Sequence, residues 1–242
     1  MTETAAPEPR DADNWAANVD RLRVSDRSSK HGYSVDGRRV AGPMNGFGRL
    51  WQRTYSAVVG PAVSPEQLVA DWRLHFGEYW PPMGRFHGSV SSIQPGDVTT
   101  LTAGGVTTGI LVLYADATSF TFLTPEGHMF AAMITFSAER DDHGATVAQI
   151  RMLLRCSDPV FEAMWPLARR GEDIFWPGVL RNLAAAHGTD HVEVLATTEC
   201  LDRRRLWRNW TNVRYNAALR SIAHAVGTPF RRDRASMRSE ST

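Results

Sequence analysis

The chain has 242 residues, of which 43% are hydrophobic and 22% charged, so its composition is globular and excludes a disordered chain. The formal net charge of +1 argues against a dedicated nucleic-acid-binding protein. Cys156 and Cys200 lie far apart, which indicates neither a disulfide framework nor a zinc site. The first ten residues are polar and no apolar run approaches the roughly 20 residues of a membrane-spanning helix, so we expect a cytoplasmic protein.

The first part of the chain predicts an arm, a strand and a helix. Residues 1–39 lack periodicity and predict a flexible N-terminal arm. The glycine-rich turn Gly42–Gly48 lacks the Gly-Lys-Ser/Thr ending of a phosphate-binding loop, and we expect no cofactor. Leu50–Val59 predicts a strand. A helix then begins with Ser64 as N-cap, Pro65 at the first position and Gln67 placed to close a capping box.

From residue 85 the pattern changes to short strands separated by turns. Closely spaced strands with tight turns indicate antiparallel hairpins. The expected strands are Phe86–Ile93, Val98–Thr102, Val106–Tyr114, Ser119–Thr124, His128–Arg140 and Ala145–Cys156. The last strand alternates: its even residues from Ala148 to Leu154 are apolar, whereas Gln149, Arg151 and Arg155 share the other face.

A long helix follows, with Asp158 as N-cap, Pro159 at its first position and His187-Gly188 at its end. Pro166, Gly171 and Pro177 predict a kink or a break inside it. Residues 189–228 then predict a strand, His191–Leu201, and a basic amphipathic helix over 202–226 that packs on the body. Residues 229–242 predict a frayed tail.

This order of elements predicts an α+β fold in which a curled antiparallel sheet is wrapped around the long helix. A sheet with one apolar face must bury that face, and the long helix is its natural cover. Residues 40–188 would form this domain. Because inward side chains need not fill the space under the helix, we expect an apolar internal cavity.

The order also resembles the START-like, polyketide-cyclase-like helix-grip (SRPBCC) superfamily. The resemblance is carried by Gly96–Tyr114, by Ser119–His128 with its Gly127-His128 turn, and by Arg169–Trp176. These stretches are similar to a group of unknown function within or near that superfamily. The resemblance covers residues 42–188 and implies the helix-grip fold with a hydrophobic cavity. It implies no particular reaction.

His128 is the first candidate for chemistry, because it follows a glycine turn and can titrate near neutral pH. Glu126 is near it in sequence, and Arg151 could clamp a carboxylate or phosphate if its strand face lines the cavity. Alternatively, the His128 ring bonds the backbone of the turn, and Arg151 faces solvent. Asp173 could pair with a sheet arginine such as Arg151.

The residues expected to contact a ligand are those of the aromatic strands, the long helix and the polar strand face. They are Tyr114, Phe120, Phe122, Thr124, Phe130, Gln149, Trp165, Asp173 and Trp176. We expect no metal site: His187 and His191 are four residues apart, but Gly188 ends the helix between them.

Three functions remain open at this point. The first is a binding protein for a small hydrophobic or amphipathic molecule such as a lipid, polyketide or isoprenoid-like compound. The second is a cavity enzyme of the cyclase, dehydratase or lyase type that uses His128 with Arg151 or Glu126. The third is an interaction module that forms a homo-oligomer through the C-terminal helix. We expect no nucleic-acid partner and no membrane span.

Overall fold

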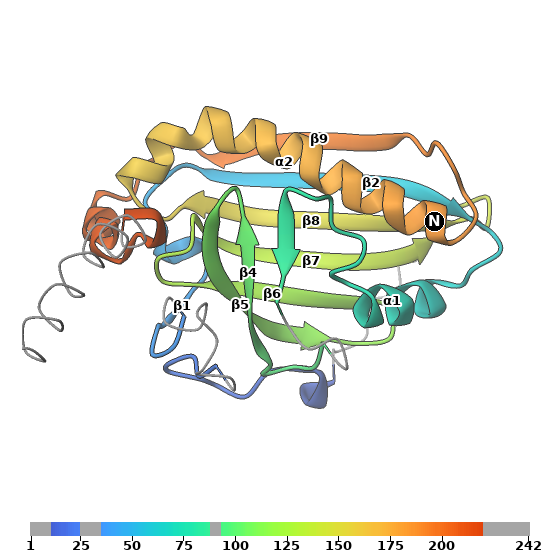
Figure 1. Ribbon diagram of the computed structural model, residues 1–242, viewed down its shortest axis with the longest axis horizontal. Coiled ribbons are helices and arrows are strands. Elements are labelled where there is room, and N and C mark those ends of the chain that lie inside the picture. The colour runs from blue at the N-terminus through green and yellow to red at the C-terminus, as the bar shows by residue number, and fades with distance from the viewer. Residues whose placement is uncertain (1–10, 25–34, 88–92, 220–242) are drawn as a thin grey trace, which may run out of the picture.

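The computed structural model describes residues 11–24, 35–87 and 93–219 (Figure 1). Its helices are α1 (Pro65–Leu74) and α2 (Pro159–Ala186), with short 3-10 turns η1 (Ala12–Asn14) and η3 (Pro43–Asn45) and a longer 3-10 helix η4 (Trp207–Tyr215). Its strands are β1 (Val40–Ala41), β2 (Leu50–Gly60), β3 (Gly84–Phe86), β4 (Val98–Ala103), β5 (Val106–Ala115), β6 (Ser119–Pro125), β7 (Phe130–Arg140), β8 (Thr146–Cys156) and β9 (Val194–Asp202). No described helix is long and apolar enough to cross a membrane.

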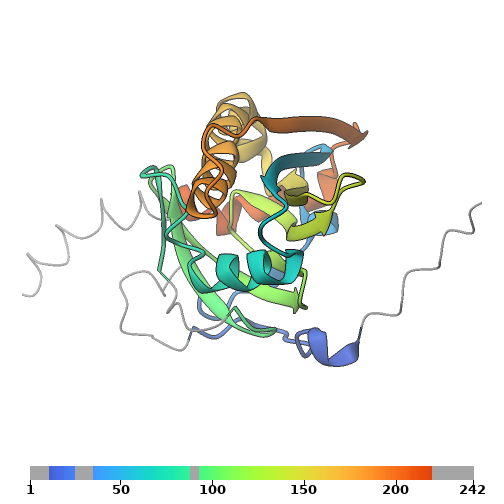
Figure 2. The same ribbon diagram turned by 90° about the vertical axis from the view of Figure 1, so that its right-hand side faces the viewer.

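The strands form one antiparallel sheet in the order β3-β4-β5-β6-β7-β8-β2-β9, with β1 paired to β6. The three longest strands lie side by side at its centre, where Ile150 of β8 pairs with Tyr55 of β2 and Phe136 of β7. The sheet curls, and α2 crosses its concave face over β2 and β8 (Figures 1 and 2). The α+β, helix-grip arrangement predicted from the sequence is therefore confirmed.

Aromatic rings pack the part of the interior next to α1. The ring of Phe76 lies 5.1–5.7 Å, centroid to centroid, from five others: Trp80, Phe86, Phe120, Phe122 and Phe136. Trp72 of α1 adds edge contacts to the rings of Phe120 and Phe136. Such contacts each contribute about 0.5–1.5 kcal/mol beyond burial. In this region, side chains occupy the space that the sequence predicted to be an open cavity.

The predicted helix ends are present. Ser64 and Gln67 form a capping box at α1, and one oxygen of Asp158 accepts hydrogen bonds from the N–H groups of Val160 and Phe161 at α2. The sequence predicted a kink or a break in α2; of the two, the break is absent, since the helix continues through Pro166 and Pro177. Each proline still removes one backbone donor, so the helical ladder is weakened at two places.

The N-terminal arm covers part of the outer face of the sheet. Leu22, Val24 and Val35 are buried against Leu111, and the ring of Trp15 packs on Tyr114. The flexible arm predicted over residues 1–39 therefore contains two docked segments, because these apolar side chains gain more from burial than from solvation.

The C-terminal extension differs from the prediction. The strand expected over His191–Leu201 is present as β9, which pairs with β2, but the next element is the 3-10 helix η4, so the expected α-helix does not begin at residue 202. The residues after 219 lie outside the described part of the chain. Side-chain amides explain the change: Asn209 and Asn212 donate to backbone carbonyls of the turn before β2, which fixes η4 on the body.

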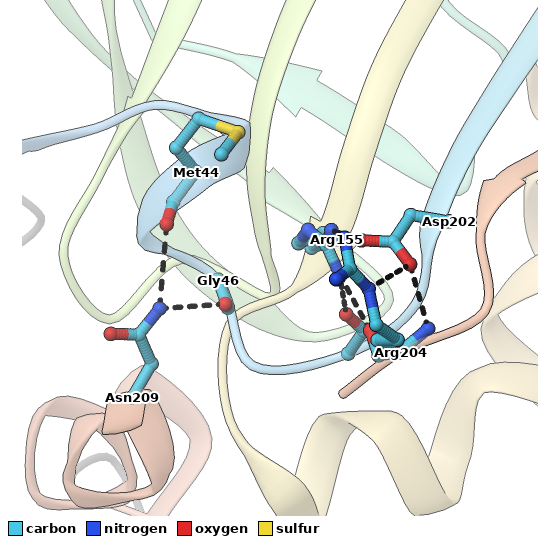
Figure 3. A network of polar contacts seen from close by, with 7 residues as sticks. Met44, Gly46, Arg155, Asp202, Arg204 and Asn209 are labelled. Carbon is cyan, nitrogen blue, oxygen red and sulfur yellow. Dashed lines mark hydrogen bonds and ion pairs between the residues drawn. The ribbon is translucent and has the colours of Figure 1, made fainter. Parts of the chain in front are cut away.

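Buried Arg155 locks this extension to the outer face of β8 (Figure 3). Its guanidinium donates to the carbonyl oxygens of Gly48 at 2.6 Å and Arg204 at 2.8 Å, and it pairs with Asp202 at 2.8 Å. The side chain of Asn209 donates to the carbonyl of Gly46 close by. The sequence placed Arg155 on the polar face of its strand; the structure covers the Arg155 end of that face with the extension, whereas Arg151 on the same face is exposed.

Candidate functional site

A charged cluster is buried at the centre of the grip. The odd-numbered residues of β2 point toward α2, and among them Arg53 is only 1% exposed. Its two terminal nitrogens pair with Glu172 and Asp173 of α2, and its Nε donates to Thr198 of β9 at 3.3 Å. All three nitrogens of the guanidinium are thus engaged, which holds Arg53 in one orientation.

The two carboxylates have different surroundings. The Glu172 side chain is 12% exposed and that of Asp173 is 44% exposed, although they are neighbours on the helix. Asp173 also has the Arg169 guanidinium at 3.9 Å. Glu172 is the more buried of the two, so burial acts mainly on its carboxyl group.

Burial raises the pKa of Glu172 to about 7; the attraction of Arg53 opposes this shift and the charge of Asp173 reinforces it. Burial also raises the pKa of the Tyr55 hydroxyl above its ordinary value, while Arg53 acts in the opposite direction. That hydroxyl stays protonated and donates to Asp173 at 3.2 Å. The cluster therefore holds a carboxyl group that changes protonation near neutral pH.

Aromatic rings surround the cluster. Trp51 stacks on Trp165 with 5.7 Å between ring centroids, and Phe130 meets Trp165 edge-on at 5.8 Å. The Arg53 guanidinium lies 5.3 Å from the ring centre of Tyr55 and 5.8 Å from that of Trp165. The indole N–H of Trp51 is buried and has no hydrogen-bond partner among the described residues.

The predicted ligand-contacting residues separate into two groups. Phe120, Phe122, Phe130, Trp165 and Trp176 belong to the main core between α2 and the sheet. Asp173 reaches this interior too, but its sheet partner is Arg53 and not Arg151.

The other three predicted contacts lie elsewhere. Tyr114 packs on Trp15 of the arm and donates to Asp116. The hydroxyl of Thr124 is bonded to backbone groups of Ala41 and Ala132. Gln149 is on the outer face of β8, where it accepts from Arg151.

The three predicted catalytic residues do not meet. Nδ1 of His128 accepts from the Phe130 N–H at 2.9 Å, so the ring bonds the backbone of its own turn. Burial lowers the pKa of His128 to about 4, which keeps the ring neutral at physiological pH. A carboxylate oxygen of Glu126 faces the N–H of Arg39 instead.

Arg151 is remote from His128. It is exposed and pairs across the sheet with Thr135, whereas Phe130, next to His128, pairs with Cys156. Five residues along a strand span about 17 Å. The even residues of β8 face the core, so Arg151 points away from it.

Arg53, Tyr55 and Trp51 were not predicted as site residues, although the sequence contains a usable signal. Along β2, positions 51, 53, 55, 57 and 59 read Trp, Arg, Tyr, Ala and Val, whereas the alternate positions 52, 54 and 56 are polar. An arginine on the apolar face of a strand must be paired when it is buried. The position of Arg53 among apolar residues could have identified it as a buried, paired side chain. The pattern along β2 does not indicate which carboxylates pair with it.

A second polar cluster joins α1 to the end of α2. Asp71 accepts from Tyr79, lies 2.8 Å from Nδ1 of His75 and lies 3.0 Å from Nε2 of His187. These contacts lower the pKa of Asp71 although its partial burial opposes them. Among the described residues, no group of three or more His, Cys, Asp or Glu side chains is arranged to hold a metal ion.

A small polar pocket of about 150 Å³ lies outside the grip, between β1, η3 and η4. Its walls include Glu126, Ser157, Asn209, Asn212 and Tyr215. Gly127 is required here, because its φ is +89° and a Cβ at this position would lie 2.2 Å from the carbonyl oxygen of Tyr215. The Gly127-His128 turn thus forms a close contact with η4.

The chain matches no protein-family model and no curated protein. Among solved structures, it is similar to protein Ms6760 from Mycobacterium smegmatis (17% identity, TM-score 0.40, 58% of this chain and 92% of that one). It is also similar to Ara h 8.0201 (15% identity, TM-score 0.39, 57% and 97%) and to the di-domain ARO/CYC StfQ from the steffimycin biosynthetic pathway (13% identity, TM-score 0.42, 57% and 50%). The helix-grip fold of the chain follows from its own strand order and from the position of α2 over β2 and β8.

Proposed function

We propose that the protein binds a small amphipathic molecule between α2 and the sheet, with its polar end near Trp51, Arg53 and Glu172. The observation that carries this proposal is the buried, unpartnered indole N–H of Trp51 beside the charged cluster. Buried donors are almost always paired, because an unpaired one costs about 1–3 kcal/mol. An oxygen atom of a ligand would supply the partner.

The charges at the cluster favour a ligand with a neutral polar end. Arg53 already faces two carboxylates, so a third anion would add buried negative charge without a counter-ion. A hydroxyl or ketone oxygen can accept from Trp51 without this cost. The rings of Trp165 and Phe130 offer an apolar wall for the rest of the molecule. A lipid alcohol, a polyketide or an isoprenoid-like compound meets both conditions.

Entry of such a ligand requires α2 to move, since aromatic side chains occupy the adjoining interior. The segment that carries Glu172 and Asp173 lies between Pro166 and Pro177. Because neither proline donates a backbone hydrogen bond, α2 can bend at these two places at a lower cost than an unbroken helix. Movement of this segment would open the space beside Trp51.

The test combines identification and titration. Protein purified gently from its own host is examined by native mass spectrometry and extracted with organic solvent; we expect a stoichiometric apolar molecule with a neutral oxygen. Retinol, a fluorescent apolar alcohol, then serves as a titration probe. Trp51→Phe keeps an aromatic ring but removes the pyrrole part of the indole with its N–H, so retinol should bind about three- to tenfold more weakly.

Trp80→Phe is the matched control, because the indole N–H of Trp80 is also buried and unpartnered but lies against Phe76 and Phe175. This variant should bind retinol as the parent protein does. An empty protein that does not bind retinol would contradict the proposal. Equal weakening in both variants would also contradict it, because the effect would then not depend on the position of Trp51.

A second candidate function is acid–base catalysis on the bound molecule, and the pKa of Glu172 near 7 favours it. A carboxyl group with this pKa can both donate and accept a proton at neutral pH. Incubation of the extracted molecule with the protein should then yield a product, and Glu172→Gln should abolish its formation. Recovery of the unchanged molecule with the parent protein would leave binding as the function.

A further inference from the structure

We propose that the segment Arg203–Tyr215, which comprises η4 and the turn before it, docks on an anionic lipid surface. This inference is independent of the interior site. The segment contains no acidic residue and five exposed arginines: Arg203, Arg204, Arg205, Arg208 and Arg214. It also contains Trp207 and Trp210, whose exposed fractions are 69% and 55%. Two solvent-exposed indoles beside a dense positive charge indicate a partner that offers both an apolar environment and negative charge.

The positive charge is only partly neutralised within the chain. Arg204 pairs with Asp202 at 3.0 Å, and Arg205 pairs with Glu162 at 3.1 Å. Arg203, Arg208 and Arg214 have no carboxylate within ion-pair distance in the described part of the structure. Three charges therefore remain available to anionic head groups, and each contributes about fivefold to binding near such a surface.

The geometry of η4 separates its residues into three rows. A 3-10 helix has three residues per turn, so side chains three apart lie above one another. Asn209 and Asn212 form the row that faces the body, where their amides donate to backbone carbonyls. Trp207 and Trp210 form a second row, and Arg208 belongs to the third.

An indole row beside a basic row is the pattern of an interfacial segment. Trp side chains prefer the boundary between head groups and acyl chains, where the ring is in apolar surroundings and the N–H remains hydrated. Arginines on the adjacent row can meet lipid phosphates at the same depth. The row of Asn209 and Asn212 keeps the segment attached to the protein.

The segment is presented in a fixed conformation. Arg155 donates to the carbonyl of Arg204 (Figure 3). The Leu206 N–H donates to the carbonyl of Phe47 at 2.7 Å. The ring of Trp207 meets that of Phe47 edge-on at 5.2 Å. Because the segment is already ordered, binding costs less conformational entropy, and this favours association with the lipid surface.

Neighbouring apolar residues favour lipid over nucleic acid. Met164 and Leu167 are exposed on the first half of α2, which begins at the same end of the molecule as η4 (Figure 1). Asn216 links the two elements through Asp158 at 2.8 Å. Exposed aliphatic side chains add nothing to the stacking of bases, but they can enter a bilayer together with the indoles.

The experiment is co-sedimentation of the full chain with vesicles, either of phosphatidylcholine alone or with one third phosphatidylserine. We expect binding to the anionic vesicles only, and its loss between about 0.1 M and about 1 M salt, as the Debye length falls from about 10 Å to about 3 Å. The double variant Arg203→Gln/Arg208→Gln should bind about 30-fold more weakly. Trp210→Ala should bind about tenfold more weakly, the factor expected from losing burial of roughly 60 Å² of ring.

Arg85→Gln/Arg181→Gln is the matched control, since it removes the same charge from exposed positions on β3 and on the second half of α2. It should bind within about twofold of the parent protein. All variants change exposed side chains, and their melting temperatures should match that of the parent. Absence of vesicle binding at low salt would overturn the proposal, as would equal weakening by both double variants. Binding of a single-stranded oligonucleotide without vesicle binding would also overturn it and assign the surface to nucleic acid.

Discussion

Replacement of Arg53 by methionine tests the charged cluster under α2. Methionine fills much of the arginine stem but removes the cation that faces Glu172 and Asp173. Removal of one partner from a buried ion pair costs about 3–5 kcal/mol when the remaining group stays charged. Glu172 can become neutral by taking up a proton, since its pKa is already about 7 in the presence of Arg53. The cost should therefore depend strongly on pH.

The direction of the pH dependence follows from the number of protons that Glu172 binds in the folded and in the unfolded state. Its pKa in the folded protein, about 7, lies above the 4.5 of an ordinary glutamate. Between these values the folded state binds more protons than the unfolded state, so stability falls as pH rises. Loss of Arg53 raises the folded pKa further and extends this fall to higher pH. Each pH unit within the window costs about 1.4 kcal/mol.

Arg53→Met should thus lose about 2 kcal/mol at pH 6, mainly through lost hydrogen bonds, and about 3–5 kcal/mol at pH 8.5. Urea unfolding at the two pH values measures both figures, provided that the denaturant slope is unchanged. The double variant Arg53→Met/Glu172→Gln should regain most of the difference at pH 8.5, because no buried carboxylate remains. The reasoning would be refuted by a loss independent of pH, or by a double variant no more stable than the single one.

Three further predictions concern the turn and the extension. In the parent protein the buried His128 ring resists protonation, so stability should fall by up to about 1.4 kcal/mol per pH unit as pH drops from 6.5 to about 4. His128→Gln should remove this fall, which melting temperatures at pH 7 and pH 5 will show. Gly127→Ala should cost about 2–4 kcal/mol through strain and a clash with a carbonyl, whereas Gly104→Ala, with φ +57° and open space, should cost about 1 kcal/mol in the same unfolding assay. Arg155→Met should cost about 3–5 kcal/mol and speed tryptic cleavage in the arginine-rich turn after β9, while Arg151→Met on the exposed strand face should cleave as the parent does.

Several elements could be predicted because their signals are local. Ser64 and Gln67 cap α1, and Asp158 caps α2, through contacts between residues at most three apart. The alternation along β8 separated its apolar face from its polar face for the same reason. Of the kink or break expected in α2, no break occurs: the helix is continuous through Pro166 and Pro177, and the buried Trp165 and Trp176, which directly precede these prolines, hold it against the core.

The candidate site could be predicted only in part. The aromatic residues Phe130 and Trp165 were expected at the interior, and both contribute to the walls around the cluster. The polar centre was assigned to His128 and Arg151, because each stands out in its own strand. The ring of His128 is bonded to the backbone of its own turn, and Arg151 points to solvent.

The sequence by itself determined most of the strands, the starts of α1 and α2, and the two unlike faces of β8. These properties depend on the period of side chains along one element and on contacts between near neighbours. Only the tertiary structure decided that Arg53 meets Glu172 and Asp173, about 120 residues later in the chain, and that η4 turns its indoles outward. Such pairings depend on how α2 lies across the curled sheet and on which polar groups the packing deprives of water, and no local pattern contains that information.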